Sequence, residues 1–260
     1  MVVIVPQSCK PFLREDLLLF KRPNLLFTCL VTIPSVIFFG SLVLVFGVFS
    51  RGKIGWMATF CNLNWGRWML WAHSVNTHIE GPGLKNLSSL KGVVFVSNHQ
   101  SLLDIPVLFK YLPAESSFIA KRELFHIPLF GWAAYFCGTI FIDRARGAQN
   151  RSLSSVTKYL NEGRSIIMFP EGTRSPTGEL GNFKRGAFVF AIQAQVPIVP
   201  ISILNTRDLL PKGKLAAAPG DVRIFVDRPI QTTGMNLDDR LALAEKVREM
   251  ISRRLSGELN

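Results

Sequence analysis

The sequence predicts an α/β fold, a mixed sheet covered by helices, preceded by an N-terminal membrane-associating helical region. Three observations support this prediction. A long apolar stretch lies near the N-terminus, short β-branched runs alternate with longer helical patterns after Gly81, and 260 residues are enough for one α/β domain of ordinary size. We therefore expect a membrane-anchoring region over residues 1–80 and an α/β domain over residues 81–260.

The apolar stretch is the first expected element. No charged residue occurs from Pro23 to Ser50, and residues 25–49, at about 1.5 Å per residue, would cross a bilayer core of about 30 Å as a helix. This length argues against a cleaved signal peptide. Basic residues on both sides favour the cytoplasmic side for both ends. A spanning helix and a re-entrant hairpin both remain open, with a slight preference for a hairpin that breaks at Pro34.

A tryptophan-rich segment comes next. Four of the five tryptophans lie within residues 54–71, namely Trp56, Trp65, Trp68 and Trp71. Tryptophan is typical of membrane interfaces, because its ring is apolar and its N–H is polar. The alternative is that these rings pack against the domain that follows.

After Gly81, strands and helices are expected in alternation. The expected strands are Val93–Ser97, Ser117–Ala120, Thr139–Ile142, Ser165–Phe169, Ile198–Leu204 and Val222–Val226. The expected helices are Leu102–Tyr111, Pro128–Phe136, Ala148–Asn161, Lys184–Gln195 and Leu237–Leu255. This order gives a largely parallel or mixed sheet, in which loops at the strand ends carry the functional residues.

Charge and missing motifs narrow the function. The 30 Lys and Arg residues exceed the 18 Asp and Glu residues, and the net charge of +12 suits nucleic acid, an anionic membrane or a phosphorylated substrate. The patterns G-x-S-x-G, G-x-x-x-x-G-K-[ST], G-x-G-x-x-G and H-E-x-x-H are missing, which argues against serine hydrolases, P-loop enzymes, dinucleotide enzymes and zincins. The four cysteines lack zinc-ligand spacing, so we expect a metal-free mechanism.

The first candidate chemical group follows the strand Val93–Ser97. His99 lies at the end of this strand, five residues before Asp104. An imidazole that is held by a carboxylate on one nitrogen can accept a proton on the other near neutral pH. The alternative is a helix-capping pair of Ser101 and Asp104, with His99 as an ordinary turn residue.

Candidate anion-binding groups follow other strands. Residues 169–175 contain Gly172, which lets backbone amides approach a ligand, and Arg174, whose planar guanidinium suits phosphate. Arg144 and Lys121 come after two further strands and should reach the same edge of the sheet. An ordinary polar loop and a structural ion pair of Arg144 with Asp143 or Glu171 are the alternatives.

Together these motifs resemble the glycerolipid acyltransferase family, most closely the bacterial 1-acyl-glycerol-3-phosphate acyltransferases. Four blocks occur in the family's order, from about Gly92 to Ile201. They are N-H-x-x-x-x-D with Asn98, His99 and Asp104, G-x-x-F-I-x-R with Gly138, Phe141, Ile142 and Arg144, F-P-E-G-T-R with Phe169 to Arg174, and V-P-I-V-P with Val196 to Pro200.

The resemblance implies a 1-acylglycerol-3-phosphate O-acyltransferase in which His99 is the general base and Asp104 orients it. The base would remove the proton of the sn-2 hydroxyl, which attacks the thioester of acyl-CoA or acyl carrier protein and gives phosphatidic acid without an acyl-enzyme. No cofactor is expected besides this acyl donor. A sister acyltransferase that uses another lysophospholipid or a lyso-aminolipid is the alternative, and a non-catalytic membrane scaffold is a distant one.

The resemblance also implies a substrate-binding set. It comprises Arg144, Glu171, Gly172, Thr173 and Arg174, with Lys121 as a weaker candidate for phosphate or oxyanion stabilisation. Glu171 would repel a phosphate unless it accepts hydrogen bonds, so it could organise the loop instead of touching substrate. The implied partners are membrane lipid, lysophosphatidic acid and the acyl donor, without nucleic acid. The implied location is a bacterial inner membrane, with the catalytic domain on the cytoplasmic face.

Overall fold

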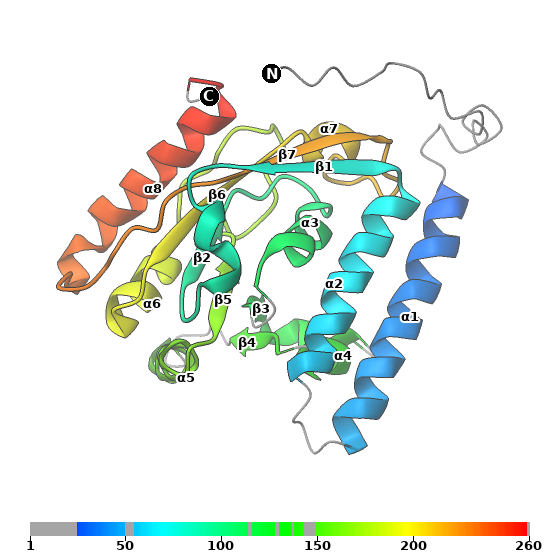
Figure 1. Ribbon diagram of the computed structural model, residues 1–260, viewed down its shortest axis with the longest axis horizontal. Helices are drawn as coiled ribbons and strands as arrows, with labels where there is room; N and C mark the ends of the chain where they lie inside the picture. Colours follow the sequence, from blue (N-terminus) through cyan, green and yellow to red (C-terminus); the bar gives the residue numbers. More distant parts are fainter. Residues whose placement is uncertain are drawn as a thin grey trace, which may run out of the picture.

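A computed structural model gives the fold of residues 25–49, 55–113, 116–127, 130–136, 138–142 and 149–258. These residues form a seven-stranded sheet with helices on both faces, and two long helices stand side by side at one end (Figure 1). The predicted α/β class with an N-terminal helical region is confirmed.

The sheet has the strand order β1-β7-β6-β2-β5-β3-β4. Its strands are β1 Val75–Glu80, β2 Val94–Ser97, β3 Ser116–Lys121, β4 Ile140–Ile142, β5 Ser165–Met168, β6 Ile198–Leu204 and β7 Gly220–Val226. All neighbours are parallel except β6 and β7, so the sheet is mixed as expected. The six predicted strands are confirmed. The sequence did not predict β1, which lies in the segment assigned to the anchor but pairs with β7.

The helices follow the predicted alternation. They are α1 Leu25–Phe49, α2 Gly55–Ala72, α3 Asp104–Tyr111, α4 Phe130–Phe136, α5 Gln149–Asn161, α6 Gly186–Ala194, α7 Thr206–Leu209 and α8 Arg240–Leu255. Short 3₁₀ turns are η2 Leu84–Ser89, η3 Arg122–His126 and η4 Leu237–Asp239. The five helices expected after Gly81 are confirmed with small shifts at their ends, whereas the short α7 was not expected.

The predicted break at Pro34 is wrong. Helix α1 continues through Pro34 without interruption, and the chain reverses direction between α1 and α2 instead (Figure 1). A proline inside a helix removes one backbone hydrogen bond. Packing of α1 against α2 and α4 supports the helix on both sides of this defect, since tertiary packing supplies most helical stability.

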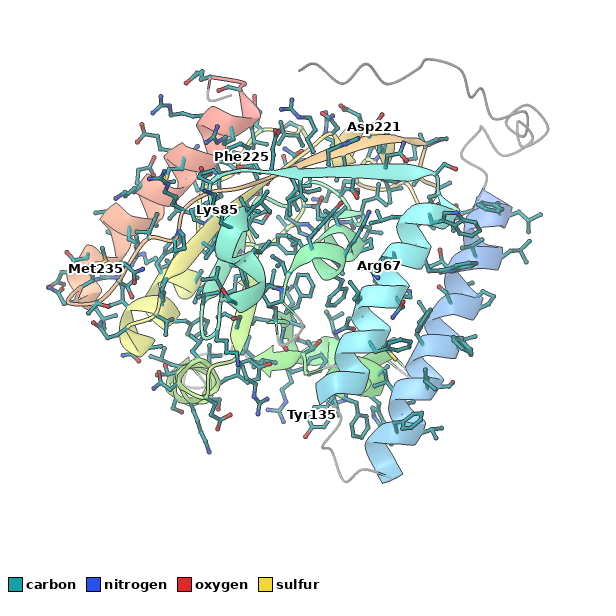
Figure 2. The ribbon with its side chains drawn as sticks, in the orientation of Figure 1. Arg67, Lys85, Tyr135, Asp221, Phe225 and Met235 are labelled. Carbon is teal, nitrogen blue, oxygen red and sulfur yellow. The ribbon has the colours of Figure 1, made fainter. Side chains whose placement is uncertain are left out.

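The outer face of α1 is apolar and exposed. Residues Leu25–Phe46 are long and apolar enough to cross a membrane, and only 17% of the most apolar window is buried inside the protein. Figure 2 shows side chains of α1 that project away from the sheet. In α2, Trp68 is 41% exposed and Trp71 is 71% exposed, whereas Trp65 packs edge-on against Phe109 of α3. The packing alternative is therefore confirmed for Trp65, and membrane contact by the exposed Trp68 and Trp71 stays a prediction. The side chain of Trp56 lies outside the described residues.

Two apolar cores cover the two faces of the sheet. Because successive side chains of a strand point to opposite faces, Phe95 packs with α2 and α3, while Val94 and Val96 pack with α5, α6 and α8. These three side chains of β2 are fully buried, as is that of Ser97. The core thus fixes β2 in the middle of the sheet, and with it the loop that begins at Asn98.

Candidate active site

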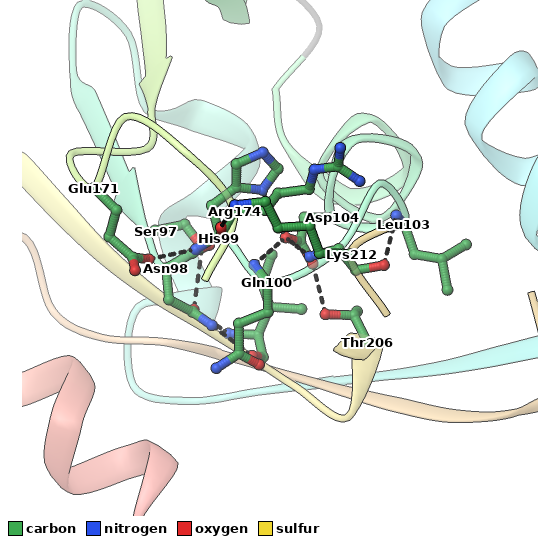
Figure 3. Close-up of polar contacts among 12 residues, drawn as sticks. Ser97, Asn98, His99, Gln100, Leu103, Asp104, Glu171, Arg174, Thr206 and Lys212 are labelled. Carbon is green, nitrogen blue, oxygen red and sulfur yellow. Dashed lines mark hydrogen bonds and ion pairs between the residues drawn. The ribbon is translucent and has the colours of Figure 1, made fainter. Parts of the chain in front are cut away.

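Three loops meet at the carboxyl ends of the central strands. The parallel pairing of β2 with β5 and with β6 brings residues 98–104, 169–175 and 205–212 to one edge of the sheet (Figure 3). The side chain of Asn98 accepts from the N–H of Ile203 and donates to its carbonyl, each at 2.8 Å. This bridge fixes the end of β2 to β6, directly before His99.

His99 and Asp104 form a hydrogen-bonded pair at this edge. The distance from His99 Nδ1 to Asp104 Oδ2 is 2.8 Å, and the side chains are 14% and 0% exposed. An ionised carboxylate can only accept, so Nδ1 carries the hydrogen and Nε2 presents its lone pair. The pair can therefore take up a proton at Nε2.

Asp104 is held by three further donors. Its Oδ2 accepts from the backbone N–H of Gln100 at 2.8 Å and of Ser101 at 2.9 Å, and its Oδ1 accepts from the Thr206 hydroxyl at 2.6 Å. The bond from Ser101 has the form expected of a helix-capping pair. Only this half of a capping box is present, because the N-cap of α3 is Leu103 and it has no side-chain cap. The contact with Thr206 was not predicted from the sequence.

Aromatic rings fix the plane of the imidazole. Phe169 stacks on His99 with ring centres 4.0 Å apart and planes at 12°. Phe118 stacks on Phe169 at 5.7 Å, Phe109 meets Phe118 at 5.1 Å, and Trp65 of α2 meets Phe109 at 6.2 Å. This aromatic row connects the catalytic edge of the sheet to the anchor helices.

Glu171 organises the loop backbone. Its Oε1 accepts from the N–H of His99 at 2.8 Å, and its Oε2 accepts from the N–H of Gly181 at 3.0 Å. Burial raises the pKa of this carboxyl, and the two backbone hydrogen bonds oppose the rise. The carboxylate is thus directed at the protein's own backbone, which is the organising alternative that the sequence left open.

Three cationic side chains gather on the loop after β5. Arg174 precedes Ser175, and the N–H of Ser175 donates to the carbonyl of His99 at 2.9 Å. This hydrogen bond holds the backbone next to Arg174 against the backbone of His99. Lys212 Nζ donates to the carbonyl of Arg174 at 2.8 Å and to the Thr173 hydroxyl at 3.4 Å. Lys184 lies over Gly172, where an added Cβ would come within 2.5 Å of Nζ. With φ +73° at Gly172, the backbone conformation favours glycine here, whereas the flexible Lys184 side chain could move to make space.

Two further predicted substrate residues are Lys121 and Arg144. Lys121 ends β3 and is exposed, and within the described residues it makes no ion pair. Arg144 lies outside the described residues. Lys212 was not anticipated from the sequence, since no strand or motif marks its position.

Comparisons with known proteins agree on one family. Residues 78–204 match the family model described as Acyltransferase. The chain is 40% identical over 172 residues to human 1-acyl-sn-glycerol-3-phosphate acyltransferase alpha, covering 65% of this chain and 61% of that protein. It is 42% identical over 151 residues to the chloroplastic 1-acyl-sn-glycerol-3-phosphate acyltransferase BAT2 of Brassica napus, covering 57% and 44%. The chain thus spans about three fifths or less of these relatives.

A solved structure matches over a larger share. The crystal structure of the 1-acyl-sn-glycerophosphate (LPA) acyltransferase PlsC from Thermotoga maritima superimposes with a TM-score of 0.76 at 28% identity. The match covers 92% of this chain and 95% of that one.

Proposed function

We propose that the chain, whose residues 78–204 match the acyltransferase family model, transfers a fatty-acyl group to the sn-2 hydroxyl of 1-acyl-glycerol-3-phosphate, giving phosphatidic acid. The observation that carries the proposal is the buried Asp104 at 2.8 Å from His99, with Nε2 left as an acceptor. This arrangement suits a general base that acts on a hydroxyl group.

The proposed reaction needs one base and no protein nucleophile. Nε2 of His99 takes the proton of the sn-2 hydroxyl as its oxygen forms a bond to the thioester carbonyl carbon. Asp104 stabilises the imidazolium that results. When the carbon–sulfur bond breaks, the imidazolium returns the proton to the departing thiolate, so the products are an ester and a free thiol.

The phosphate of the acceptor is proposed to bind to the loop after β5. A guanidinium can hold two phosphate oxygens at once, which suits Arg174, and Lys212 and Lys184 add positive charge beside it. Thr173 and Gly172 contribute a hydroxyl and the close backbone approach. Arg144 and Lys121 remain proposed cationic contributors from the sequence resemblance, and Glu171 serves as loop organiser.

The acyl donor and the location complete the proposal. The donor is acyl-CoA or acyl carrier protein, and no cofactor is invoked. The exposed apolar face of α1, with Trp68 and Trp71 of α2, supports membrane attachment. We place the catalytic domain on the cytoplasmic face of a membrane, the bacterial inner membrane in a bacterial host.

The test is an acyl-transfer assay on the full chain in detergent or liposomes. Oleoyl-CoA or oleoyl carrier protein is offered with lysophosphatidic acid, lysophosphatidylcholine, lysophosphatidylglycerol or glycerol-3-phosphate, and products are resolved by mass. We expect phosphatidic acid from lysophosphatidic acid. Loss of the base should lower turnover of His99→Ala by at least about 10²-fold. The control His78→Ala, on the exposed edge of β1, should keep full turnover.

Two results would contradict the proposal. Substantial turnover by His99→Ala would remove the general-base mechanism. Product from another acceptor alone would keep the mechanism but assign the protein to a sister acyltransferase, the runner-up from the sequence.

A further inference from the structure

A groove of about 670 Å³ runs between α1 and α2. Most of its lining is apolar, with aliphatic and aromatic side chains from α1 and two indole rings from α2. Its main lining residues are Val31, Phe38, Phe39, Arg67, Trp68 and Trp71. Figure 2 marks Arg67 on α2, beside α1.

The groove lies on the side of α2 that faces away from the sheet. Gly66 of α2 packs tightly on α3, where an added Cβ would come within 2.7 Å of the Pro106 carbonyl. The groove-lining positions Arg67, Trp68 and Trp71 occupy a different face of the same helix, at helical spacing. The groove is therefore separate from the edge of the sheet that carries His99.

Arg67 has no counter-ion in the part of the chain that the structure describes. It is the only charged residue in α1 and α2 and is exposed in the groove. Its side chain makes no hydrogen bond and no ion pair with any residue that the structure describes. A guanidinium beside apolar side chains is best matched by an anion that itself carries an apolar chain.

We propose that this groove binds one phospholipid with an anionic head group. One acyl chain lies along Val31, Phe38 and Phe39, and the phosphate pairs with Arg67. Trp68 and Trp71, with ring centres 5.1 Å apart, line the same groove beside Arg67. The site is distinct from the proposed acyl-transfer site and involves no chemical step.

The two tryptophans allow a direct test by fluorescence quenching. The full chain is bound to two sets of vesicles of identical composition, phosphatidylcholine with phosphatidylglycerol. Bromine is placed on the chains of phosphatidylglycerol in one set and of phosphatidylcholine in the other, at equal label density. Surface charge is the same in both sets, so an excess of quenching by labelled phosphatidylglycerol reports selective contact with the anionic lipid.

Variants locate that contact. The excess should be lost in Arg67→Gln and kept in Arg67→Lys. It should also be kept in the matched control Arg228→Gln, which removes an exposed charge after β7. Val31→Phe, which narrows the groove without changing charge, should reduce the excess. Quenching is normalised to the vesicle-bound fraction, and circular dichroism verifies that each variant is folded.

Three outcomes would overturn the proposal. One is equal quenching by both label positions in the unmodified protein, and another is an unchanged excess in Arg67→Gln. The third is a dimer by light scattering with equal quenching, because a second copy would then cover the groove. The measurement contains no acyl donor, so its failure would leave the proposed acyl transfer untouched, and a failed acyl-transfer assay would leave this site untouched.

Discussion

The buried His99–Asp104 pair and the exposed cations of the following loop lie at one edge of the sheet, yet they are built in opposite ways. Asp104 is 0% exposed and accepts from four donors, so its position is fixed by the protein alone. Arg174, Lys184 and Lys212 are partly or fully exposed, and Arg174 has no acidic partner within the described residues. The difference fits the proposed function, in which the base is held in one geometry and Arg174 is available to an incoming anion.

The sharpest way to break this comparison is Asp104→Asn. The amide keeps the shape of the carboxylate but loses the charge that stabilises the imidazolium. We expect kcat to fall by about 10²- to 10⁴-fold with little change in KM for lysophosphatidic acid. The control Asp208→Asn, at an exposed carboxylate in α7, should leave kcat unchanged. A rise in KM as large as the expected fall in kcat would show that the His99–Asp104 pair contributes to substrate binding instead.

On the exposed side of the comparison, Arg174→Ala should act on binding. A charge-assisted hydrogen bond contributes about 1.5–3 kcal/mol, so KM for lysophosphatidic acid should rise by roughly 10- to 100-fold. The value of kcat should change little, because the base is intact. Arg164→Ala, at an exposed pair with Glu162, is the matched control. Steady-state kinetics with an unchanged KM would place the phosphate elsewhere.

Glu171→Gln tests whether the loop is held as firmly as the base. An amide has one acceptor oxygen, so one of the N–H groups of His99 and Gly181 loses its partner. We expect the free energy of unfolding to fall by about 1–3 kcal/mol, measured by denaturant titration in detergent. Unchanged stability would mean that the loop does not depend on this carboxylate.

The loss of stability in Glu171→Gln should depend on pH in a direction that the raised pKa of Glu171 sets. Because burial raises the pKa of Glu171 in the folded protein, the folded state binds more protons than the unfolded state just above the ordinary value of 4.5. This carboxyl therefore contributes stability at low pH that is lost as the pH rises through the raised pKa. The destabilisation by Glu171→Gln should be larger below pH 4.5 than at neutral pH, and the opposite trend would reject this assignment.

The smallest effect is expected for Lys212→Met. The ammonium group of Lys212 already donates to the Arg174 carbonyl and to the Thr173 hydroxyl. It therefore adds positive charge and holds the loop, but part of its hydrogen-bonding capacity is already used. An exposed interaction of this kind contributes about 0.2–1 kcal/mol, which gives a rise in KM of about 1.4- to 5-fold. Lys214→Met, two residues further along, should give no rise. A rise as large as that of Arg174→Ala would make Lys212 a principal phosphate ligand.

Local patterns predicted most of the fold. The β-branched runs located six strands, and helical periodicity located five helices, because burial on a sheet or helix face leaves a local signature. The strand β1 was not predicted because it lacks the continuous β-branched run that marked the other strands: three of its six side chains are polar or charged and exposed. The break predicted at Pro34 was wrong because packing of α1 on distant segments outweighs the loss of one backbone hydrogen bond at the proline.

The candidate site divides in the same way. His99 and Asp104 are five residues apart, and the polar residues of the loop after β5 are consecutive, so their proximity follows from short spacing at strand ends. Thr206 reaches Asp104 across 102 positions, and Lys212 reaches Arg174 across 38. Such contacts depend on how β6 and α7 lie beside β2, which local patterns do not encode.

The aromatic row from His99 to Trp65 has a consequence for how the protein meets its substrate. The rings connect the imidazole through Phe169, Phe118 and Phe109 to α2, and Gly66 locks α2 against α3. Under the proposed function, these contacts link the proposed base to the proposed membrane anchor, so the protein's own dimensions set the height of Nε2 above the bilayer. Encounter with a lysolipid then becomes a search in two dimensions, in which molecules that diffuse laterally in the leaflet pass the base at a constant depth.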